Sequence, residues 1–150
     1  MSLAPGRKAP AFSGVDQNGQ KISLASFKGK KVVLYFYPQD GTPTCTVQAC
    51  NLRDSFPALQ AAGYEVIGVS PDSVKKHKGF ETKHQLPFTL IADPDHVILE
   101  KYGVWGEKQL YGKKYMGVIR TTFLIDEEGK IERIIEKPKS KEHGAEILGN

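Results

Sequence analysis

Two cysteines, Cys45 and Cys50, are the residues of this 150-residue sequence whose type and spacing best suit chemistry. They are its only cysteines, and four residues separate them. An apolar run, 32–37, ends shortly before them, and a turn rich in Pro, Gly and Thr leads into a helical pattern from about Pro43. Cys45 is therefore expected in the first turn of a helix, where unpaired backbone N–H groups and the helix dipole favour a thiolate. A thiolate there is a reactive nucleophile, and a second thiol nearby can resolve the product that it forms.

Other interpretations of these residues stay open at this point. Cys45 suits an inert buried thiol, Thr42 a plain turn residue, and Cys50 a core position on the apolar face of the helix. A structural zinc site is not expected, because zinc needs four ligands at close spacing and the histidines are scattered. We expect no metal, and we expect each histidine to lie at the surface: His77, His84, His96 and His143.

Composition places the chain among ordinary globular proteins. Its net charge of +4 includes paired lysines spread along the sequence rather than the concentrated basic stripe of a nucleic-acid binder. No apolar run approaches the ~18 residues of a membrane span. The segment 1–8 has no apolar stretch, which predicts no secretory signal. A close cysteine pair without such a signal indicates a cytoplasmic, reducing setting, where it is more often catalytic than structural.

The elements that must position the cysteines follow from hydrophobic periodicity and turn residues. Asn18-Gly19 supplies the positive φ angles of a tight hairpin turn. Pro43 suits the first turn of the helix, Gly63 suits the residue past its end, and Asp72 or Ser73 can cap the next helix. The predicted elements are a hairpin over 12–24, strands over 31–37, 65–70 and 89–92, helices over 43–62 and 74–84, a helix capped by Asp93 or Asp95 and ending near Gly103, a loop over 105–116, a hairpin of 118–125 and 130–135, and a helix over 142–148.

This order predicts an α/β protein. The strand–helix–strand unit around the cysteines implies a parallel pair with a right-handed crossover. A βαβ half is followed by an α and ββα half, which is the thioredoxin-like arrangement: a central mixed sheet flanked by helices, here with an N-terminal β-hairpin extension. We expect one domain over residues 1–150.

Several motifs together resemble the peroxiredoxins, and within them the peroxiredoxin Q, or bacterioferritin comigratory protein, group. The pattern Pro38-x-x-x-Thr42-x-x-Cys45 matches the family's signature around its reactive cysteine, and Cys50 stands at the spacing of that group's second cysteine. Further matching blocks are 36–38, 49–54, 103–108 and 120–126. The resemblance spans about residues 9–136.

The resemblance implies a thiol-dependent peroxidase that reduces hydrogen peroxide and organic hydroperoxides in antioxidant defence. Cys45 would become a sulfenic acid and Cys50 would resolve it as an intramolecular disulfide. Thr42 would hold the peroxide, Pro38 would shield the thiolate, and Arg120 would supply a cation beside it. Thioredoxin or a similar dithiol would reduce the disulfide, no cofactor is needed, and a monomer suffices.

Helix geometry adds a condition. Five residues along an intact α-helix give ~7.5 Å of rise and about 140° of rotation, so the two Cα atoms would lie ~8–9 Å apart. That exceeds the ~7 Å that a disulfide spans, so the helix start must unwind in each cycle. Thr44 and Gln48 depart from the Gly and Glu frequent in relatives. Stiff Thr44 bears on the rate of unwinding, and uncharged Gln48 repels a thiolate less.

Two other functions remain in view. A thiol–disulfide oxidoreductase shares the helix-start cysteine but normally carries Cys-x-x-Cys, which is absent from this sequence. A redox sensor would use the disulfide to change a binding surface without rapid turnover. Turnover with peroxide separates these two functions from a peroxidase.

Overall fold

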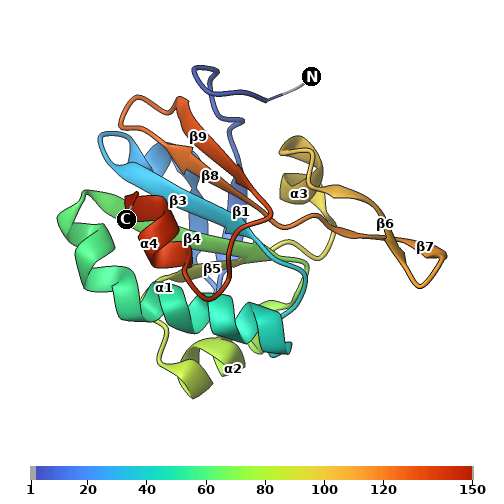
Figure 1. The fold of residues 1–150 in the computed structure, drawn as a ribbon. Coiled ribbons are helices and arrows are strands. Elements are labelled where there is room, and N and C mark those ends of the chain that lie inside the picture. Colours follow the sequence, from blue (N-terminus) through green and yellow to red (C-terminus); the bar gives the residue numbers. More distant parts are fainter. Residues whose placement is uncertain (1–2, 150) are drawn as a thin grey trace.

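A seven-stranded sheet forms the centre of the protein, which a computed structural model describes over residues 3–149 (Figure 1). Strands β3 (Lys31–Phe36), β4 (Tyr64–Ser70) and β5 (Thr89–Ala92) run parallel, and the remaining neighbours pair antiparallel. The mixed sheet and the parallel pair around the cysteines are therefore confirmed. In spatial order the strands are β2 (Lys21–Ser23), β1 (Ser13–Asp16), β5, β4, β3, β8 (Thr121–Ile125) and β9 (Ile131–Glu136).

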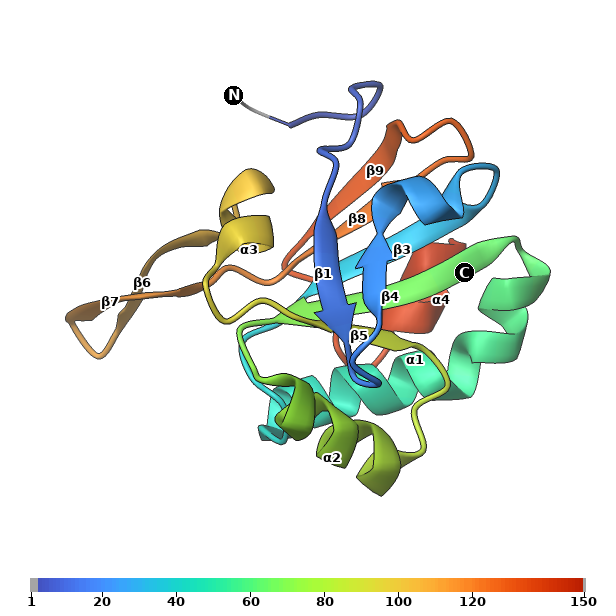
Figure 2. The same cartoon turned by 180° about the vertical axis from the view of Figure 1, so that it is seen from behind.

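Helices cover both faces of the sheet (Figures 1 and 2). Side chains of β3 alternate between the faces, as in any strand. Val33 and Tyr35 pack with residues of α1 (Pro43–Ala61), α2 (Val74–His84) and α4 (His143–Leu148). Val32 and Leu34 pack with α3 (Val97–Lys101), the 3₁₀ helix η1 (Leu24–Phe27) and the N-terminal segment. The result is three layers, with α1 packed beside β4 at the middle of the sheet.

The chain leaves β3 and enters α1 through a short loop over residues 37–42, which Figure 1 shows bending from the carboxyl end of β3 into the start of the helix. Pro43 is the first helical residue, as predicted. Gly63 follows the last helical turn with φ +91°, a left-handed conformation that glycine adopts without strain. Both ends of α1 therefore lie where the sequence placed them, within a residue.

The predicted loop over 105–116 is wrong, because this segment forms an antiparallel two-stranded arm, β6 (Trp105–Leu110) and β7 (Lys113–Val118). The arm projects from the body of the protein (Figure 1). Tyr111 and Gly112 both have positive φ, which suits a two-residue hairpin turn. Tyr111 is 95% exposed, and most of β6 and β7 is also exposed. A strand that water surrounds needs no alternation of apolar and polar residues, so periodicity does not reveal it.

The N-terminal hairpin is confirmed, but its turn differs from the predicted one. Gly19 has φ +77°, whereas Asn18 is not left-handed. The Asp16 carboxylate instead accepts hydrogen bonds from the backbone N–H groups of Asn18 and Gln20, both at 2.9 Å. A four-residue turn organised by an aspartate therefore replaces the tight two-residue turn.

The predicted N-cap residue is confirmed in α2 and is wrong in α3. Ser73 caps α2 and accepts from the backbone N–H of Lys76. In α3 the N-cap position is occupied by left-handed His96 rather than by an aspartate. Asp93 nevertheless serves the same helix, because its carboxylate accepts from the N–H of Leu99 at 2.8 Å.

The expectation that all four histidines lie at the surface is wrong. His77 and His143 are fully buried, and His84 and His96 are partly buried. Among residues 3–149, no helix combines the length and apolar character needed to cross a membrane. The terminal segment expected to lack a signal is described only from Leu3 onward, because residues 1–2 and 150 lie outside the described part.

Buried His143 predicts that acid destabilises the fold. Its Nε2 pairs with the Thr122 hydroxyl at 2.8 Å, and its Nδ1 with a Glu146 carboxylate oxygen at 2.9 Å. Burial lowers the pKa of His143 and outweighs the opposing effect of Glu146. The unfolded chain then binds more protons than the folded one below pH ~6.5, so this residue's contribution to stability falls as pH falls.

We expect the free energy of unfolding in urea to differ between wild type and His143→Gln by an amount that depends on pH. Glutamine cannot take up the proton, so the gap in the free energy of unfolding should narrow between pH 7.5 and pH 5. A gap that stays constant or widens on acidification contradicts the expectation.

Candidate active site

Cys45 is the third residue of α1 and is 1% exposed. Thr42 is the N-cap residue, but its hydroxyl donates to the carbonyl of Gln39 at 3.1 Å and caps no helical amide. Within the described residues, the backbone N–H groups of Thr44 and Cys45 have no hydrogen-bond acceptor. Free amides in the first turn and the aligned peptide dipoles both favour negative charge at this end of the helix.

Arg120 lies against the Cys45 sulfur, 75 positions away in sequence. Its Nη2 donates to Sγ at 2.9 Å, and its Nη1 donates to Oε1 of Gln48 at 3.1 Å. The sheet explains the contact, since β8 pairs with β3 so that Thr121 stands opposite Phe36. The residue before β8 is thereby placed at the end of β3, beside the loop that leads to Cys45. A guanidinium hydrogen-bonded to sulfur stabilises the thiolate over the thiol.

Gln48, one turn after Cys45, is fully buried and positions this guanidinium. Its Nε2 is a buried donor without a hydrogen-bond partner among the described residues. The buried hydroxyl of Tyr35 also lacks a partner there. Burial, followed by the nearby Asp40 and Cys45, raises the pKa of Tyr35, so its phenol stays neutral. Gln48 was expected near Cys45 only as an uncharged neighbour, and Tyr35 only as part of a buried strand.

Lys108 adds a second cation near the site. It extends from β6, and its Nζ donates to the carbonyl of Val118 at 3.0 Å. Burial and the neighbouring Arg120 lower the pKa of Lys108, while Cys45 raises it. In the sequence, Lys108 stands out only as part of a block that matches the family. Hydrophobic periodicity does not show which side chains of an exposed arm reach the body of the protein.

A buried polar network fixes the loop that carries Pro38 and Thr42. Asp40 accepts from the Tyr37 hydroxyl and lies 2.6 Å from Nδ1 of His77. The Asp40 N–H donates to the Asp72 carboxylate at 2.7 Å. Pro38 itself is half-buried at the start of the loop. These contacts tie the loop to α2 and its N-terminal turn, so Thr42 stands on a rigid support.

His77 binds acceptors on both sides of its ring. Nδ1 faces Asp40, and Nε2 lies 3.0 Å from the carbonyl of Ile91. Both ring nitrogens therefore have hydrogen-bond partners in the interior. Ligand atoms of Asp40, Asp72 and His77 lie within 4.8 Å of one another. The hydrogen bonds already satisfy them, so the arrangement does not require a cation.

Cys50 lies on the same continuous helix as Cys45, and both thiols are free. It is partly buried, and its Sγ is 3.8 Å from Nδ1 of His84, the last residue of α2. The two cysteines therefore have separate environments, one beside Arg120 and the other beside His84.

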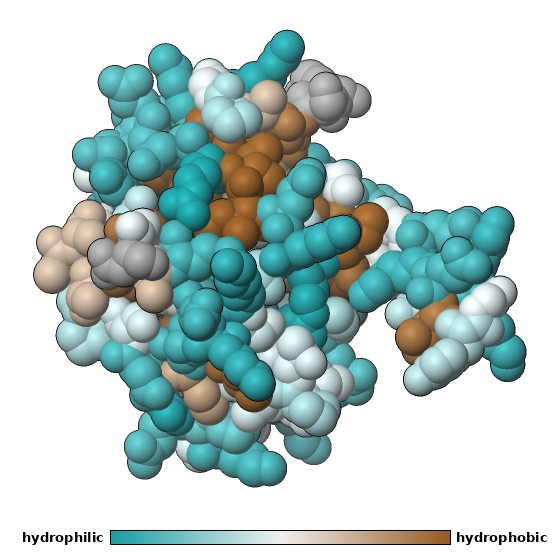
Figure 3. Space-filling view, viewed as in Figure 1, coloured by the Kyte–Doolittle hydropathy of each residue, from teal (hydrophilic) through white to brown (hydrophobic). Residues whose placement is uncertain are grey.

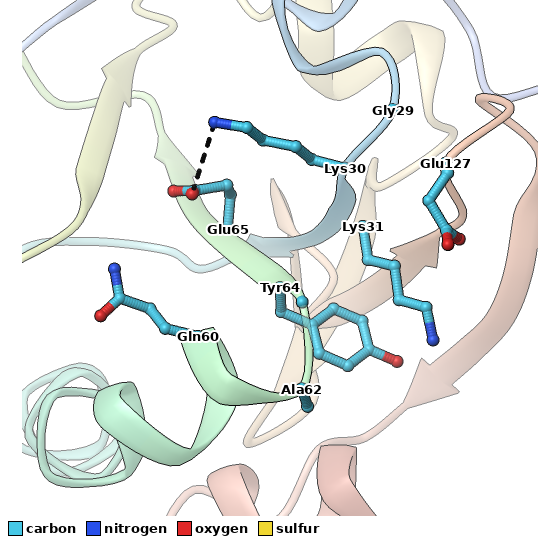
Figure 4. A pocket seen from close by; sticks show the side chains of 9 residues that line it. Gly29, Lys30, Lys31, Gln60, Ala62, Tyr64, Glu65 and Glu127 are labelled. Carbon is cyan, nitrogen blue, oxygen red and sulfur yellow. Dashed lines mark ion pairs between the residues drawn. The ribbon is translucent and has the colours of Figure 1, made fainter.

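Two hollows on the surface differ in position: one lies far from the two cysteines, and the other is lined by Arg120. One of about 390 Å³ lies at the far end of α1, between Lys30, Tyr64 and Glu127, where Lys30 and Glu65 form an ion pair (Figure 4). Another of about 550 Å³ includes Arg120 in its lining. Apolar residues in its lining include Leu3, Ile119 and Ile134. Figure 3 shows hydrophobic surface, in brown, close to the base of the arm.

Comparison with known proteins places the chain in a family. Residues 5–134 match the AhpC/TSA family. A putative peroxiredoxin Bcp of Coxiella burnetii is 51% identical over 99% of both chains. Peroxiredoxin Bcp of Escherichia coli is 47% identical over 97% of this chain and 94% of its own length.

Solved structures agree. The bacterioferritin comigratory protein of Xanthomonas campestris superposes with a TM-score of 0.89 at 32% identity, covering 97% of this chain and 96% of that protein. Peroxiredoxin Q of Xylella fastidiosa superposes with a TM-score of 0.92 at 27% identity, covering 99% of this chain and 95% of that protein. The thioredoxin-like fold expected from the sequence is thereby confirmed. The chain belongs to the AhpC/TSA family, in the Bcp or peroxiredoxin Q group, and is a thiol-dependent peroxidase.

Proposed function

We propose that Cys45 is the residue that attacks the peroxide and that Cys50 resolves the product within the same chain. The observation that carries this proposal is the contact between Arg120 and the Cys45 sulfur at the free amides of α1. Cys50 has no such cation donating to its sulfur among the described residues. The environment therefore distinguishes the attacking sulfur from the second one.

In the first step the Cys45 thiolate attacks the outer oxygen of the hydroperoxide. A sulfur–oxygen bond forms, the oxygen–oxygen bond breaks, and the departing alkoxide or hydroxide takes a proton to leave as an alcohol or water. Arg120 and the first-turn amides stabilise the charge that develops on oxygen. Thr42 holds the peroxide with its hydroxyl, and Pro38 shields the sulfur from water. The half-buried positions of Thr42 and Pro38 suit these roles.

In the second step Cys50 displaces the sulfenic oxygen of Cys45 as water and forms a disulfide. A dithiol protein, thioredoxin or one like it, then reduces the disulfide by thiol–disulfide exchange. No step requires a cofactor, because sulfur carries the electrons. The proposed substrates are hydrogen peroxide and organic hydroperoxides. The Xanthomonas campestris relative has alkyl peroxide reduction activity.

The setting follows from the same chemistry. A disulfide within one chain needs no second subunit, so we propose a monomer formed by one domain over residues 1–150. A reducing cytoplasm supplies the dithiol. The scattered lysines and the net charge of +4 support neither a nucleic-acid nor a membrane partner.

One assay separates this function from its alternatives. NADPH consumption is followed with thioredoxin, its reductase and hydrogen peroxide. Rapid turnover supports a peroxidase. Insulin reduction without peroxide would indicate a thiol–disulfide oxidoreductase, and slow stoichiometric oxidation would indicate a sensor.

Formation of the disulfide should unwind the start of α1. Both cysteines lie on one unbroken helix, where helical geometry holds their Cα atoms ~8–9 Å apart. A disulfide requires less than ~7 Å. Hydrogen exchange by mass spectrometry should therefore show that amides of residues 46–50 lose their protection in the oxidised protein, while amides of α2 keep theirs. Identical protection of residues 46–50 in both forms would refute the unwinding step.

A further inference from the structure

The Cys50 thiol has its own hydrogen-bond partner, and it comes from a different helix. His84 ends α2, and its Nδ1 lies 3.8 Å from Sγ of Cys50. Sulfur hydrogen bonds are longer than those of oxygen, and an imidazole nitrogen can either accept the thiol proton or donate to the thiolate. We propose that His84 is a catalytic partner of Cys50: it takes up the proton of the thiol and so supplies the thiolate that resolves Cys45.

The position of His84 is fixed from several sides. Its ring packs edge-on against Phe80, with ring centroids 5.0 Å apart. Its backbone carbonyl accepts from Nη1 of Arg53 at 2.8 Å, which ties the end of α2 to the turn of α1 after Cys50. His84 and Cys50 are both partly buried, so the pair can still exchange protons with water. A basic nitrogen held at the sulfur and open to solvent is suited to proton transfer.

The charges around the pair favour the thiolate. Arg53 approaches Cys50 from α1, and its cation is partly offset by Asp54, which accepts from Nε at 3.0 Å. Tyr35 on β3 lies near Cys50, and burial raises its pKa so that it stays uncharged. No carboxylate contacts the Cys50 sulfur or the His84 ring among the described residues. Arg53 therefore supports the transfer without providing a base, which leaves His84 to do so.

The proposal deepens the function proposed above and rests on it. The Cys50 proton passes from Sγ to Nδ1 of His84, and the sulfur electron pair attacks Sγ of Cys45. The sulfur–sulfur bond forms as the sulfur–oxygen bond breaks, and the departing hydroxide takes a proton to become water. Because Arg53 ties the Cys50 turn to α2, unwinding moves the Cys45 side of the helix toward a Cys50 that is already activated.

Single-turnover oxidation tests the role of His84. The reduced protein receives one equivalent of hydrogen peroxide, and alkylation with mass spectrometry follows sulfenic acid and disulfide over time from pH 6.5 to pH 9. An ordinary thiol with a pKa of ~8.5 is about 1% ionised at pH 6.5. We therefore expect His84→Gln to form the disulfide ~10-fold more slowly at pH 6.5 and at nearly the wild-type rate at pH 9. Sulfenic acid formation at Cys45 should not change.

Controls separate chemistry from structure. His96→Gln removes a histidine that stacks on Trp105, away from both cysteines, and should behave as wild type. Added imidazole should restore the rate of His84→Ala at pH 6.5. The inference fails if His84→Gln matches wild type at every pH, or if it slows equally at every pH. If Cys50→Ser sustains turnover at the wild-type rate, the resolving role of Cys50 fails first, and the role of His84 fails with it.

Discussion

Replacing Cys45 with serine is expected to reduce peroxide turnover to the rate seen without enzyme, a fall of ~10³-fold or more. Serine has nearly the same shape and suits the helix start, so the buried site should keep its packing. A hydroxyl, however, is not deprotonated by a neighbouring arginine at neutral pH and cannot be oxidised to a sulfenic acid. The NADPH-coupled assay measures the loss, and circular dichroism checks that the variant is folded.

The second cysteine provides the matched control. Cys50→Ser should still consume one equivalent of peroxide and accumulate sulfenic acid at Cys45, because its site beside Arg120 is intact. Turnover with thioredoxin should stop after that first equivalent. Appreciable peroxide turnover by Cys45→Ser would remove the central nucleophile from the mechanism. The mechanism would also fail if Cys45→Ser consumed the first equivalent of peroxide and Cys50→Ser did not.

Much of the fold could be predicted because strong local signals coincide with tertiary demands. The apolar run that became β3 is buried on both faces, and Pro43 and Gly63 bound α1 as their backbone preferences require. The helix even contains Pro57, which usually ends a helix. The buried residues of α1, which pack against the sheet and α4, outweigh that local cost.

The features that could not be predicted are mostly contacts between side chains that lie far apart in the sequence. Arg120 was placed at the site only through resemblance, since the pairing of β8 with β3 is not visible in either segment alone. His77 was expected at the surface, but Asp40 and Ile91 satisfy its ring in the interior. The exposed β6–β7 arm lacks an apolar face and so lacks the signal on which strand prediction rests.

The structure also bears on the two departures from the family pattern. Thr44 is exposed at the second position of α1 in ordinary helical geometry, so glycine is not required there by the backbone. Gln48 is buried and accepts from Arg120 through its amide oxygen. A neutral acceptor at this position orients the guanidinium while leaving its charge available to Cys45. The departure at Gln48 therefore fits the proposed chemistry.

Replacing Arg120 with methionine should have the second largest effect. The substitution keeps an unbranched side chain but removes the donor at 2.9 Å from Sγ and the cation beside the developing oxygen charge. Loss of one such donor in an enzyme costs ~10²–10³-fold, and we expect a fall of this size in the second-order rate of sulfenic acid formation. Arg120→Lys should recover part of it, because it returns a charge but lacks the planar fork whose two nitrogens donate to Cys45 and Gln48. Rapid-quench mass spectrometry at limiting peroxide measures the rate directly.

A matched control makes this result decisive for the proposed site. Arg7→Met, a change at an exposed arginine, should leave the rate unaltered and accounts for loss of net charge alone. A rate within twofold of wild type would mean that Arg120 touches the sulfur without assisting the reaction.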